Sequence, residues 1–289
     1  MNNLQESELI LNPNGSVYHL HLKEHQIAQN VIIVGDPGRV NEVAKHFETV
    51  HFYEQKREFV TKTGTYKGKN ITVLSTGIGC DNIDIVINEL DALVNFNLSK
   101  RKINKTKKAL NIIRIGTCGA LQEDIEVDSF VASSHGLGFD GLLHYYQYDN
   151  NKQETELLNA FVRHSKWPKG PAQPYIFEAS DCLMEKIAFD MHKGITATTG
   201  GFYGPQGRYL RAPLKNPEIN DTLRDFRYND QRILNFEMET SALYGLGNRI
   251  LGHQCLTVCA VIANREQKKF SHDPYKTIDA LIGVVLDRI

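Results

Sequence analysis

Short apolar runs rich in β-branched residues alternate along the chain with segments whose apolar positions recur at helical spacing. Each run is interpreted as a buried strand, and the runs cover residues 31–34, 71–74, 110–115, 129–132 and 255–263. The helical segments cover residues 82–95, 154–165, 237–250 and 273–288. This alternation predicts an α/β fold. The run 255–263 is apolar almost throughout, which predicts a strand in mid-sheet with helices on both faces.

One predicted helix, 237–250, has a buried face formed by Met238, Ala242, Leu246 and Ile250. Residues 100–108 contain six basic residues in nine but no interleaved aromatic side chain. This pattern is more typical of a solvated loop than of a nucleic-acid site. Because no internal repeat or Pro/Ser-rich linker divides the chain, we expect residues 1–289 to form a single domain.

The charge balance is nearly neutral, since 33 basic and 34 acidic side chains give a formal net charge of −1. Such a chain has no global field that attracts nucleic acid or an anionic membrane, so anion binding needs a local cluster of arginines. Its five cysteines include no Cys-x-x-Cys pair, which argues against a zinc module or a disulfide framework and favours a reducing cytoplasm. Residues 1–14 are polar and no stretch reaches membrane-spanning length. We therefore expect a cytoplasmic protein without a nucleic-acid, membrane or metal partner.

A strand-to-helix turn follows the run 31–34. There Asp36 can cap a helix and Pro37 suits its first turn. Such a turn offers free backbone N–H groups and the positive end of a helix, and Gly35 lets an anion approach the main chain. Arg39 would add a guanidinium group to this anion site. The alternative interpretation is a plain capped turn with an exposed arginine.

Arg114 lies near the end of another apolar run, and the following Gly-Thr-Cys-Gly offers N–H groups and the hydroxyl of Thr117. An arginine at the tip of a buried strand is costly unless it is paired. In open α/β sheets ligands bind at the carboxyl ends of strands, where Arg39 and Arg114 both fall. With Arg57, these residues are predicted to clamp a phosphate. Alternatively, Arg114 pairs with a core carboxylate such as Asp128.

The run 202–208, Phe-Tyr-Gly-Pro-Gln-Gly-Arg, places an amide and a guanidinium two residues apart. Gln206 offers a donor and an acceptor, whereas Arg208 offers only donors. Together they match a ring that presents a carbonyl, an N–H and a second carbonyl, as uracil does; purines present a different pattern. Fixed donors here would also stabilise negative charge on a departing base. The alternative is an ordinary surface turn.

Two glutamates flank Met238 at the start of the predicted helix 237–250. In one interpretation both carboxylates only stabilise the helix dipole. In the other, the thioether of Met238 backs a sugar face while Glu239 accepts hydrogen bonds from vicinal hydroxyls.

In their order along the chain, these motifs resemble those of the nucleoside phosphorylases of the hexameric, uridine-phosphorylase-like type. The matching pieces are Tyr18-His19-Leu20, Gly35-Asp36-Pro37-x-Arg39-Val40, Arg57-Glu58-Phe59, Ser75-Thr76-Gly77-Ile78-Gly79, Arg114-Ile115-Gly116-Thr117, Phe202-Tyr203 with Gln206-x-Arg208, Glu237-Met238-Glu239 and Ile262-x-Asn264-Arg265. The resemblance implies a three-layer αβα sandwich around a central mixed, twisted sheet. It also implies phosphorolysis of uridine or deoxyuridine to uracil and (deoxy)ribose 1-phosphate in pyrimidine salvage. Inorganic phosphate is then a co-substrate, and no organic cofactor is expected.

The resemblance further implies a role for each matching residue. Phosphate binding is implied for Gly35, Arg39, Arg57, Arg114 and Thr117, ribose binding for His19, Met238 and Glu239, and base binding for Phe202, Gln206, Arg208 and Ile262. Arg114, Gln206 and Arg208 are the implied catalytic residues. His19 and Arg57 are expected to reach into a neighbouring subunit's site, which makes the active unit a homo-oligomer, either a dimer or a hexamer built from dimers.

Two departures from the family pattern affect specificity and cofactors. Purine-specific members carry an Asp after the strand that corresponds to 255–263, whereas this chain has Asn264-Arg265, which favours a pyrimidine. After Gly79 the usual Gly-Pro-Ser is replaced by Cys-Asp-Asn, which weakens the case for a monovalent-cation site built from Glu58, Ile78 and Asn82. The alternatives left open are a purine or broad-specificity phosphorylase, a hydrolytic nucleosidase and a non-catalytic nucleoside-binding protein.

Overall fold

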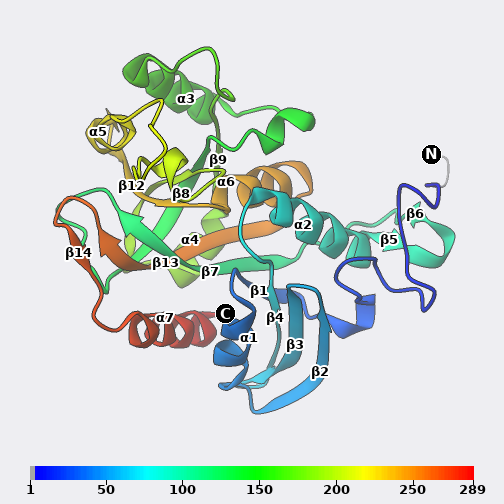
Figure 1. Ribbon diagram of the computed structural model, residues 1–289. Helices are drawn as coiled ribbons and strands as arrows, with labels where there is room; N and C mark the ends of the chain where they lie inside the picture. The colour runs from blue at the N-terminus through cyan, green and yellow to red at the C-terminus, as the bar shows by residue number, and fades with distance from the viewer. Residues whose placement is uncertain (1–3) are drawn as a thin grey trace.

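The computed structural model describes residues 4–289, and within them twelve strands form one twisted mixed sheet (Figure 1). Across the sheet the main order is β11 (Arg227–Tyr228), β12 (Gln231–Glu237), β10 (His192–Thr198), β8 (Phe130–Gly138), β13 (Gln254–Asn264), β7 (Asn111–Ala120), β1 (Asn30–Val34), β4 (Lys69–Ser75), β3 (Phe59–Tyr66) and β2 (Thr49–Lys56). In addition, β9 (Tyr175–Glu178) pairs with β8, and β14 (Lys269–Phe270) pairs with β13. Because β12 also pairs with β7, the strands β7, β13, β8, β10 and β12 close into a ring.

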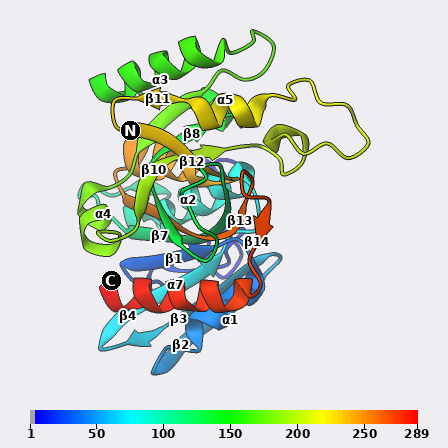
Figure 2. The same ribbon diagram turned by 90° about the vertical axis from the view of Figure 1, so that its left-hand side faces the viewer.

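Helices cover both sides of the sheet, so the predicted α/β sandwich around a central mixed sheet is confirmed (Figure 1). One side carries α1 (Pro37–Ala44) and α7 (Pro274–Arg288), with α4 (Asp181–Ile187) in contact with α7. The other side carries α2 (Cys80–Asn95), which packs on α6 (Thr240–Ala242) and the π-helix η5 (Leu243–Ile250). The helices α3 (Lys152–Ser165) and α5 (Ile219–Asp225) lie side by side at the end furthest from β2 (Figures 1 and 2). Within residues 4–289 no helix is long and apolar enough to span a bilayer.

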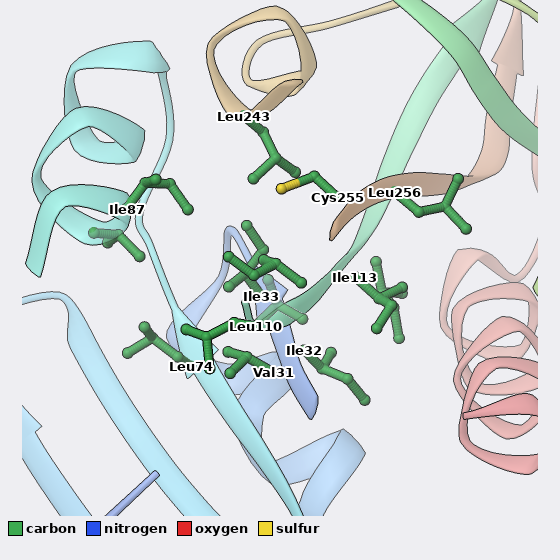
Figure 3. Packing of buried hydrophobic residues seen from close by; sticks show 14 of the residues in the cluster. Val31, Ile32, Ile33, Leu74, Ile87, Leu110, Ile113, Leu243, Cys255 and Leu256 are labelled. Atoms are coloured by element: carbon green, nitrogen blue, oxygen red, sulfur yellow. The ribbon is translucent and has the colours of Figure 1, made fainter. Parts of the chain in front are cut away.

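The central strands are apolar on both faces because helices cover both. Figure 3 shows Ile32 and Leu256 toward α7, whereas Ile33 and Cys255 point toward α2 and Leu243. Successive side chains of a strand point to opposite faces, so one apolar run fills two core layers. All four side chains are fully buried. The prediction that 255–263 lies in mid-sheet is therefore confirmed, since β13 pairs with β7 on one side and β8 on the other.

Most of the predicted helices are confirmed, but one begins at the wrong residue. The segments 82–95, 154–165 and 273–288 correspond to α2, α3 and α7 and end at the same residues. The helix predicted at 237–250 begins instead at Thr240, because β12 continues to Glu237. Met238 therefore lies in the connection before the helix and not on its buried face.

The basic segment 100–108 is not a loop throughout. It includes β6 (Lys102–Ile103), which pairs with β5 (Phe96–Asn97) in a short hairpin. Lys108 forms an ion pair with Glu24 at 2.7 Å, and the main-chain carbonyl of Arg101 accepts from the N–H of Leu4 at 3.0 Å. Part of this segment thus packs on the N-terminal part of its own chain.

Candidate active site

A cavity of about 680 Å³ opens where the carboxyl ends of β1, β7, β12 and β13 meet. Ten of the twelve predicted binding residues line it: Gly35, Arg39, Arg114, Thr117, Phe202, Gln206, Arg208, Met238, Glu239 and Ile262. His19 and Arg57 lie outside the cavity. Segments far apart in the sequence therefore meet at one edge of the sheet, the position at which open α/β folds bind ligands.

The turn between β1 and α1 has the predicted capped geometry. The Asp36 carboxylate accepts a hydrogen bond from the N–H of Gly38 at 2.8 Å, and Pro37 is the first helical residue. Arg39 is only partly exposed, and its guanidinium donates to the carbonyl of Ile115 in β7 at 3.4 Å. The alternative of a freely exposed arginine is therefore wrong.

Arg39 and Arg114 lie close enough in this cavity to affect each other. Burial lowers the pKa of Arg39, and the positive charge of Arg114 lowers it further. Two guanidinium groups in a partly dehydrated site repel each other, and an anion between them would relieve that repulsion. Gly35 and Thr117 line the same cavity, with a main chain that an anion can approach and a hydroxyl. This arrangement suits a phosphate.

Arg114 is 5% exposed and is paired with carboxylates. Its guanidinium forms a short ion pair with Glu239 and lies 3.6 Å from Glu237. Burial lowers the pKa of Arg114, but the two carboxylates outweigh it and raise that pKa above its usual value. The alternative that Arg114 pairs with a core carboxylate is thus confirmed, but with Glu239 and Glu237. Asp128 is not the partner, because its carboxylate accepts from the hydroxyls of Ser271 and Thr277.

The two glutamates have different surroundings. The Glu237 carboxylate accepts from the Thr198 hydroxyl at 2.6 Å and from the N–H groups of Glu239 and Thr240 at 2.9 Å. It thus holds the start of α6, in line with helix stabilisation, and burial raises its pKa. Glu239 instead accepts from Arg114 and from the N–H of Gly79 at 2.9 Å, and it lines the cavity. Its carboxylate is held in a fixed position, as an acceptor for sugar hydroxyls requires.

Gln206 and Arg208 lie together at the cavity wall. The run is a mostly exposed turn, with Phe202 and Tyr203 about half exposed, but Gln206 within it is only 2% exposed. Its amide nitrogen donates to the Thr199 hydroxyl oxygen at 3.1 Å, and its amide oxygen accepts from Arg208. The Arg208 guanidinium carbon lies 3.7 Å from the ring centroid of Phe202, a close cation–π contact. Burial, and then the charge of Arg265, lower the pKa of Arg208 to about 10.

Two further residues of the site were not assigned from the sequence. Arg265 donates to the main-chain carbonyl of Gln206 at 2.8 Å and so holds the run 202–208 from outside. Arg265 belongs to the motif Ile262-x-Asn264-Arg265, so the sequence contained a signal that could have identified it. Phe270 of β14 lines the cavity, but the β13–β14 pairing that brings it there left no pattern in the sequence. Asn264, the last residue of β13, holds a neighbouring loop, because its amide donates to the carbonyls of Gln122 and Ile125.

His19 and Arg57 lie near each other although neither reaches the cavity of its own chain. The His19 ring lies 2.7 Å from the Glu89 carboxylate. Arg57 lies 6.0 Å above the ring of Tyr18, which in turn contacts the His19 ring edge-on. Arg57 adopts a left-handed backbone conformation with φ of 54°, at the turn between β2 and β3. The two residues thus belong to one surface.

Three residues were considered for a monovalent-cation site that the sequence makes doubtful. Glu58, Ile78 and Asn82 all line the cavity. However, the Asn82 amide nitrogen donates to the carbonyl of Ile78 at 3.4 Å, so an N–H group points at an oxygen that a cation would need. Across residues 4–289 no group of three or more His, Cys, Asp and Glu side chains is arranged to hold a metal ion.

Comparisons with known proteins identify the family of this chain. A family model described as the phosphorylase superfamily matches residues 29–281. A uridine phosphorylase of Thermococcus kodakarensis is 31% identical over 262 residues, which cover 89% of this chain and 80% of that protein. A DeoD-type purine nucleoside phosphorylase of Bacillus thuringiensis is 28% identical over 272 residues, covering 93% and 97% of the two chains. A nucleoside phosphorylase structure from Trypanosoma brucei, described as showing uridine phosphorylase activity, superposes with a TM-score of 0.85 at 29% identity, covering 97% of this chain and 99% of that one.

Proposed function

This chain belongs to the phosphorylase superfamily, and we propose that it is a uridine phosphorylase. It cleaves the N-glycosidic bond of uridine or deoxyuridine with inorganic phosphate and releases uracil and (deoxy)ribose 1-phosphate. The observation that carries the proposal is that Arg39 and Arg114 share one cavity with the Gln206–Arg208 pair. The names of the Thermococcus kodakarensis and Trypanosoma brucei relatives support the same substrate.

Phosphate binds between Arg39 and Arg114, against the main chain at Gly35 and the hydroxyl of Thr117. Charge-assisted hydrogen bonds from guanidinium groups position such an anion and screen its charge. Arg114 enters the reaction already oriented, because its ion pair with Glu239 fixes the guanidinium. The phosphate then attacks C1′ from the face opposite the base, as an oxocarbenium-like centre forms at the sugar.

The ribose binds against Met238 and Glu239. The Glu239 carboxylate keeps its bonds to Arg114 and to the N–H groups of Gly79 and Met238, and its remaining lone pair accepts from a ribose hydroxyl. One carboxylate thereby connects the phosphate-binding arginine to the sugar. Fixing both reactants in line lowers the entropic part of the barrier without a covalent enzyme intermediate.

The base binds to Gln206 and Arg208, beside Phe202 and Ile262. As the glycosidic bond breaks, negative charge develops on the uracil ring, and the N–H groups of these two side chains stabilise it. One such preorganised donor is worth about 3 kcal/mol in a transition state, or roughly a hundredfold in rate.

We also propose that the active unit is a homo-oligomer, in which His19 and Arg57 complete the cavity of a neighbouring subunit. The support is that both residues lie outside their own cavity but gather around the partly exposed Tyr18 on one surface. Arg57 then supplies the third guanidinium for phosphate and His19 approaches the 5′ end of the sugar.

The test is to incubate the purified protein with uridine, deoxyuridine, inosine or cytidine, each with and without phosphate. We expect phosphate-dependent release of uracil from uridine. Faster cleavage of inosine would select the purine alternative, which the Bacillus thuringiensis relative keeps open. Turnover without phosphate would select a hydrolase, and uracil binding without turnover would select a non-catalytic nucleoside-binding protein.

A further inference from the structure

We propose that Thr199 is a positioning residue that fixes the orientation of the Gln206 amide and so favours a uracil edge over a cytosine edge. The inference rests on the proposed function, because it concerns how the same site recognises its base. Thr199 directly follows β10, is 1% exposed and does not line the cavity. It acts through Gln206 and not on the substrate.

The Thr199 hydroxyl can only accept a hydrogen bond from Gln206. A hydroxyl has one proton, and this one donates to the carbonyl of Gly201 at 2.9 Å. Toward Gln206 it therefore offers only a lone pair, which receives the amide N–H at 3.1 Å. The end of the Gln206 amide that faces Thr199 must therefore be the nitrogen.

The other end of the Gln206 amide, which faces Arg208, must be the oxygen. A guanidinium carries donors and no acceptor, so Arg208 can pair only with the amide oxygen of Gln206, as it does. The main chain of Gln206 is also fixed, since its carbonyl accepts from Arg265 and its N–H donates to the carbonyl of Tyr203. With the backbone held, the Gln206 amide could still rotate by a half-turn and exchange its oxygen and nitrogen. Thr199 and Arg208 both oppose that rotation.

This orientation decides what the site offers to a base. Among residues 4–289 no protein group takes the second amide N–H of Gln206 or the second lone pair of its oxygen. Together with a further N–H of Arg208, the wall offers donor, acceptor and donor in sequence. Uracil presents the complementary carbonyl, N–H and carbonyl. Cytosine presents an amino donor, a ring acceptor and a carbonyl, and it would need the reversed amide.

The decisive variant is Thr199→Val, which keeps the side-chain shape but has no oxygen to receive the amide N–H. Thr199→Ser keeps the hydroxyl. Thr196→Val is the matched control, because Thr196 lies in β10 three residues before Thr199 and its buried hydroxyl donates to the Asn235 amide oxygen at 2.9 Å, away from the cavity. We would measure kcat/KM for uridine and for cytidine, KM for phosphate, and thermal stability.

We expect Thr199→Val to lower kcat/KM for uridine by about tenfold or more. The ratio of kcat/KM for uridine to kcat/KM for cytidine should also fall, because an amide that has lost its hydrogen-bond partner discriminates less well between bases. The KM for phosphate should not change, and Thr199→Ser should restore the ratio. Thr196→Val should lose stability while keeping the ratio.

An unchanged uridine-to-cytidine ratio in Thr199→Val would overturn the inference. Equal loss of uridine cleavage in Thr199→Val and Thr196→Val would also overturn it, since that reports a general structural defect. If the wild-type protein cleaves no uridine, the proposed function fails first. Calorimetric titration with uracil then still tests Thr199: equal affinities of the wild-type protein and Thr199→Val would sink the inference.

Discussion

The guanidinium of Arg39 has fewer protein partners than that of Arg114. It makes one long hydrogen bond, to the carbonyl of Ile115 at 3.4 Å, whereas Arg114 is ion-paired with Glu239. A guanidinium without a carboxylate in a positively charged site keeps its donors for an incoming anion. Substitution of Arg39 is therefore the better test of the proposed phosphate binding. Substitution of Arg114 is the better test of the proposed connection between phosphate and sugar.

Arg39→Met should raise the KM for phosphate by about tenfold or more, because a hydrogen bond to a charged group is worth roughly 1.5–3 kcal/mol. The KM for uridine should change little. Arg163→Met, on the exposed face of α3, is the control for removing one positive charge. Initial rates over a phosphate titration provide the measurement, and equal effects of the two substitutions would contradict a specific phosphate contact.

Gln206→Glu should lower kcat/KM for uridine by about a hundredfold or more. The change keeps the side-chain size but replaces the N–H donor with a negatively charged oxygen beside a base that itself becomes negative. The KM for phosphate should stay near that of the wild-type protein. Steady-state kinetics with both substrates varied would separate these effects, and near-normal uridine turnover would rule out Gln206 as a base-binding residue.

Sequence patterns could predict residues whose chemistry is unusual for their local setting. Arg39 in a Gly-rich turn and Arg114 near the end of an apolar strand are costly placements without a ligand or partner, so both could be recognised. Thr199 and Arg265 could not be recognised in the same way. Each acts through a hydrogen bond to Gln206, and only the folded chain defines that contact. Glu239 as the partner of Arg114 was missed for the same reason.

At the scale of elements, one carboxylate outside α7 holds the first turn of this helix and the segment just before it. Asp128, in the connection between β7 and β8, accepts from the hydroxyls of Ser271 and Thr277 at 2.5 and 2.6 Å. Thr277 lies in the first turn of α7 and Ser271 just before the helix. Asp128 has a left-handed backbone with φ of 66°, a conformation that Asp and Asn tolerate better than Ala.

Asp128→Ala should therefore lower the free energy of unfolding by about 2 kcal/mol, roughly 1 kcal/mol for each lost hydrogen bond. Asp128→Asn is the matched control, because it keeps an acceptor oxygen and the left-handed conformation. Urea denaturation at neutral pH would compare the two variants. Equal stability of Asp128→Ala and the wild-type protein would show that α7 does not depend on this tie.

The same carboxylate predicts a pH dependence. The Ser271 hydroxyl, and then that of Thr277, lower the pKa of Asp128, so the folded state favours the ionised form. Its stabilisation is present above the unfolded pKa of about 4 and is lost as the pH falls through the lower folded pKa. Asp128→Asn should lack this component. Urea midpoints between neutral and acidic pH, compared for the wild-type protein and Asp128→Asn, would test it; parallel curves would contradict it.

Elements were predictable where one physical signal dominated. The helices α2, α3 and α7 each have a clear apolar periodicity, and β1 and β13 are apolar because helices cover both their faces. The strand β2 is mostly exposed, and β10 contains few apolar residues, so neither produced a pattern. In residues 237–250 the helical spacing was real, but the first residue, Glu237, belongs to β12 because it pairs with Thr198 of β10.

At the scale of the whole molecule, the site depends on the ring of strands formed by β7, β13, β8, β10 and β12. Closing this ring brings Arg114 of β7, Glu237 of β12 and Ile262 of β13 around one cavity, beside the loop that follows β10. The closing pair, β12 with β7, is antiparallel and joins segments more than a hundred residues apart. Local sequence patterns carry no information about such a pair, so convergence at the strand ends was predictable but ring closure was not.

The last prediction concerns assembly and uses two variants, each impaired in phosphate binding, to restore one complete active site. Arg57→Met leaves its own cavity intact but has no Arg57 to supply to a partner. Arg39→Met has a damaged cavity but keeps Arg57. If Arg57 serves the neighbouring subunit, a mixed dimer has one complete site, made of Arg39 from one chain and Arg57 from the other.

Random mixing after reversible dissociation should then restore about a quarter of the sites. Phosphate-dependent uracil release from the mixture, compared with each variant alone, measures the restoration. If Arg57 acts within its own chain, every site lacks one arginine and mixing restores nothing. That outcome, with oligomers observed by light scattering, would refute the shared site while leaving the phosphorylase assignment intact.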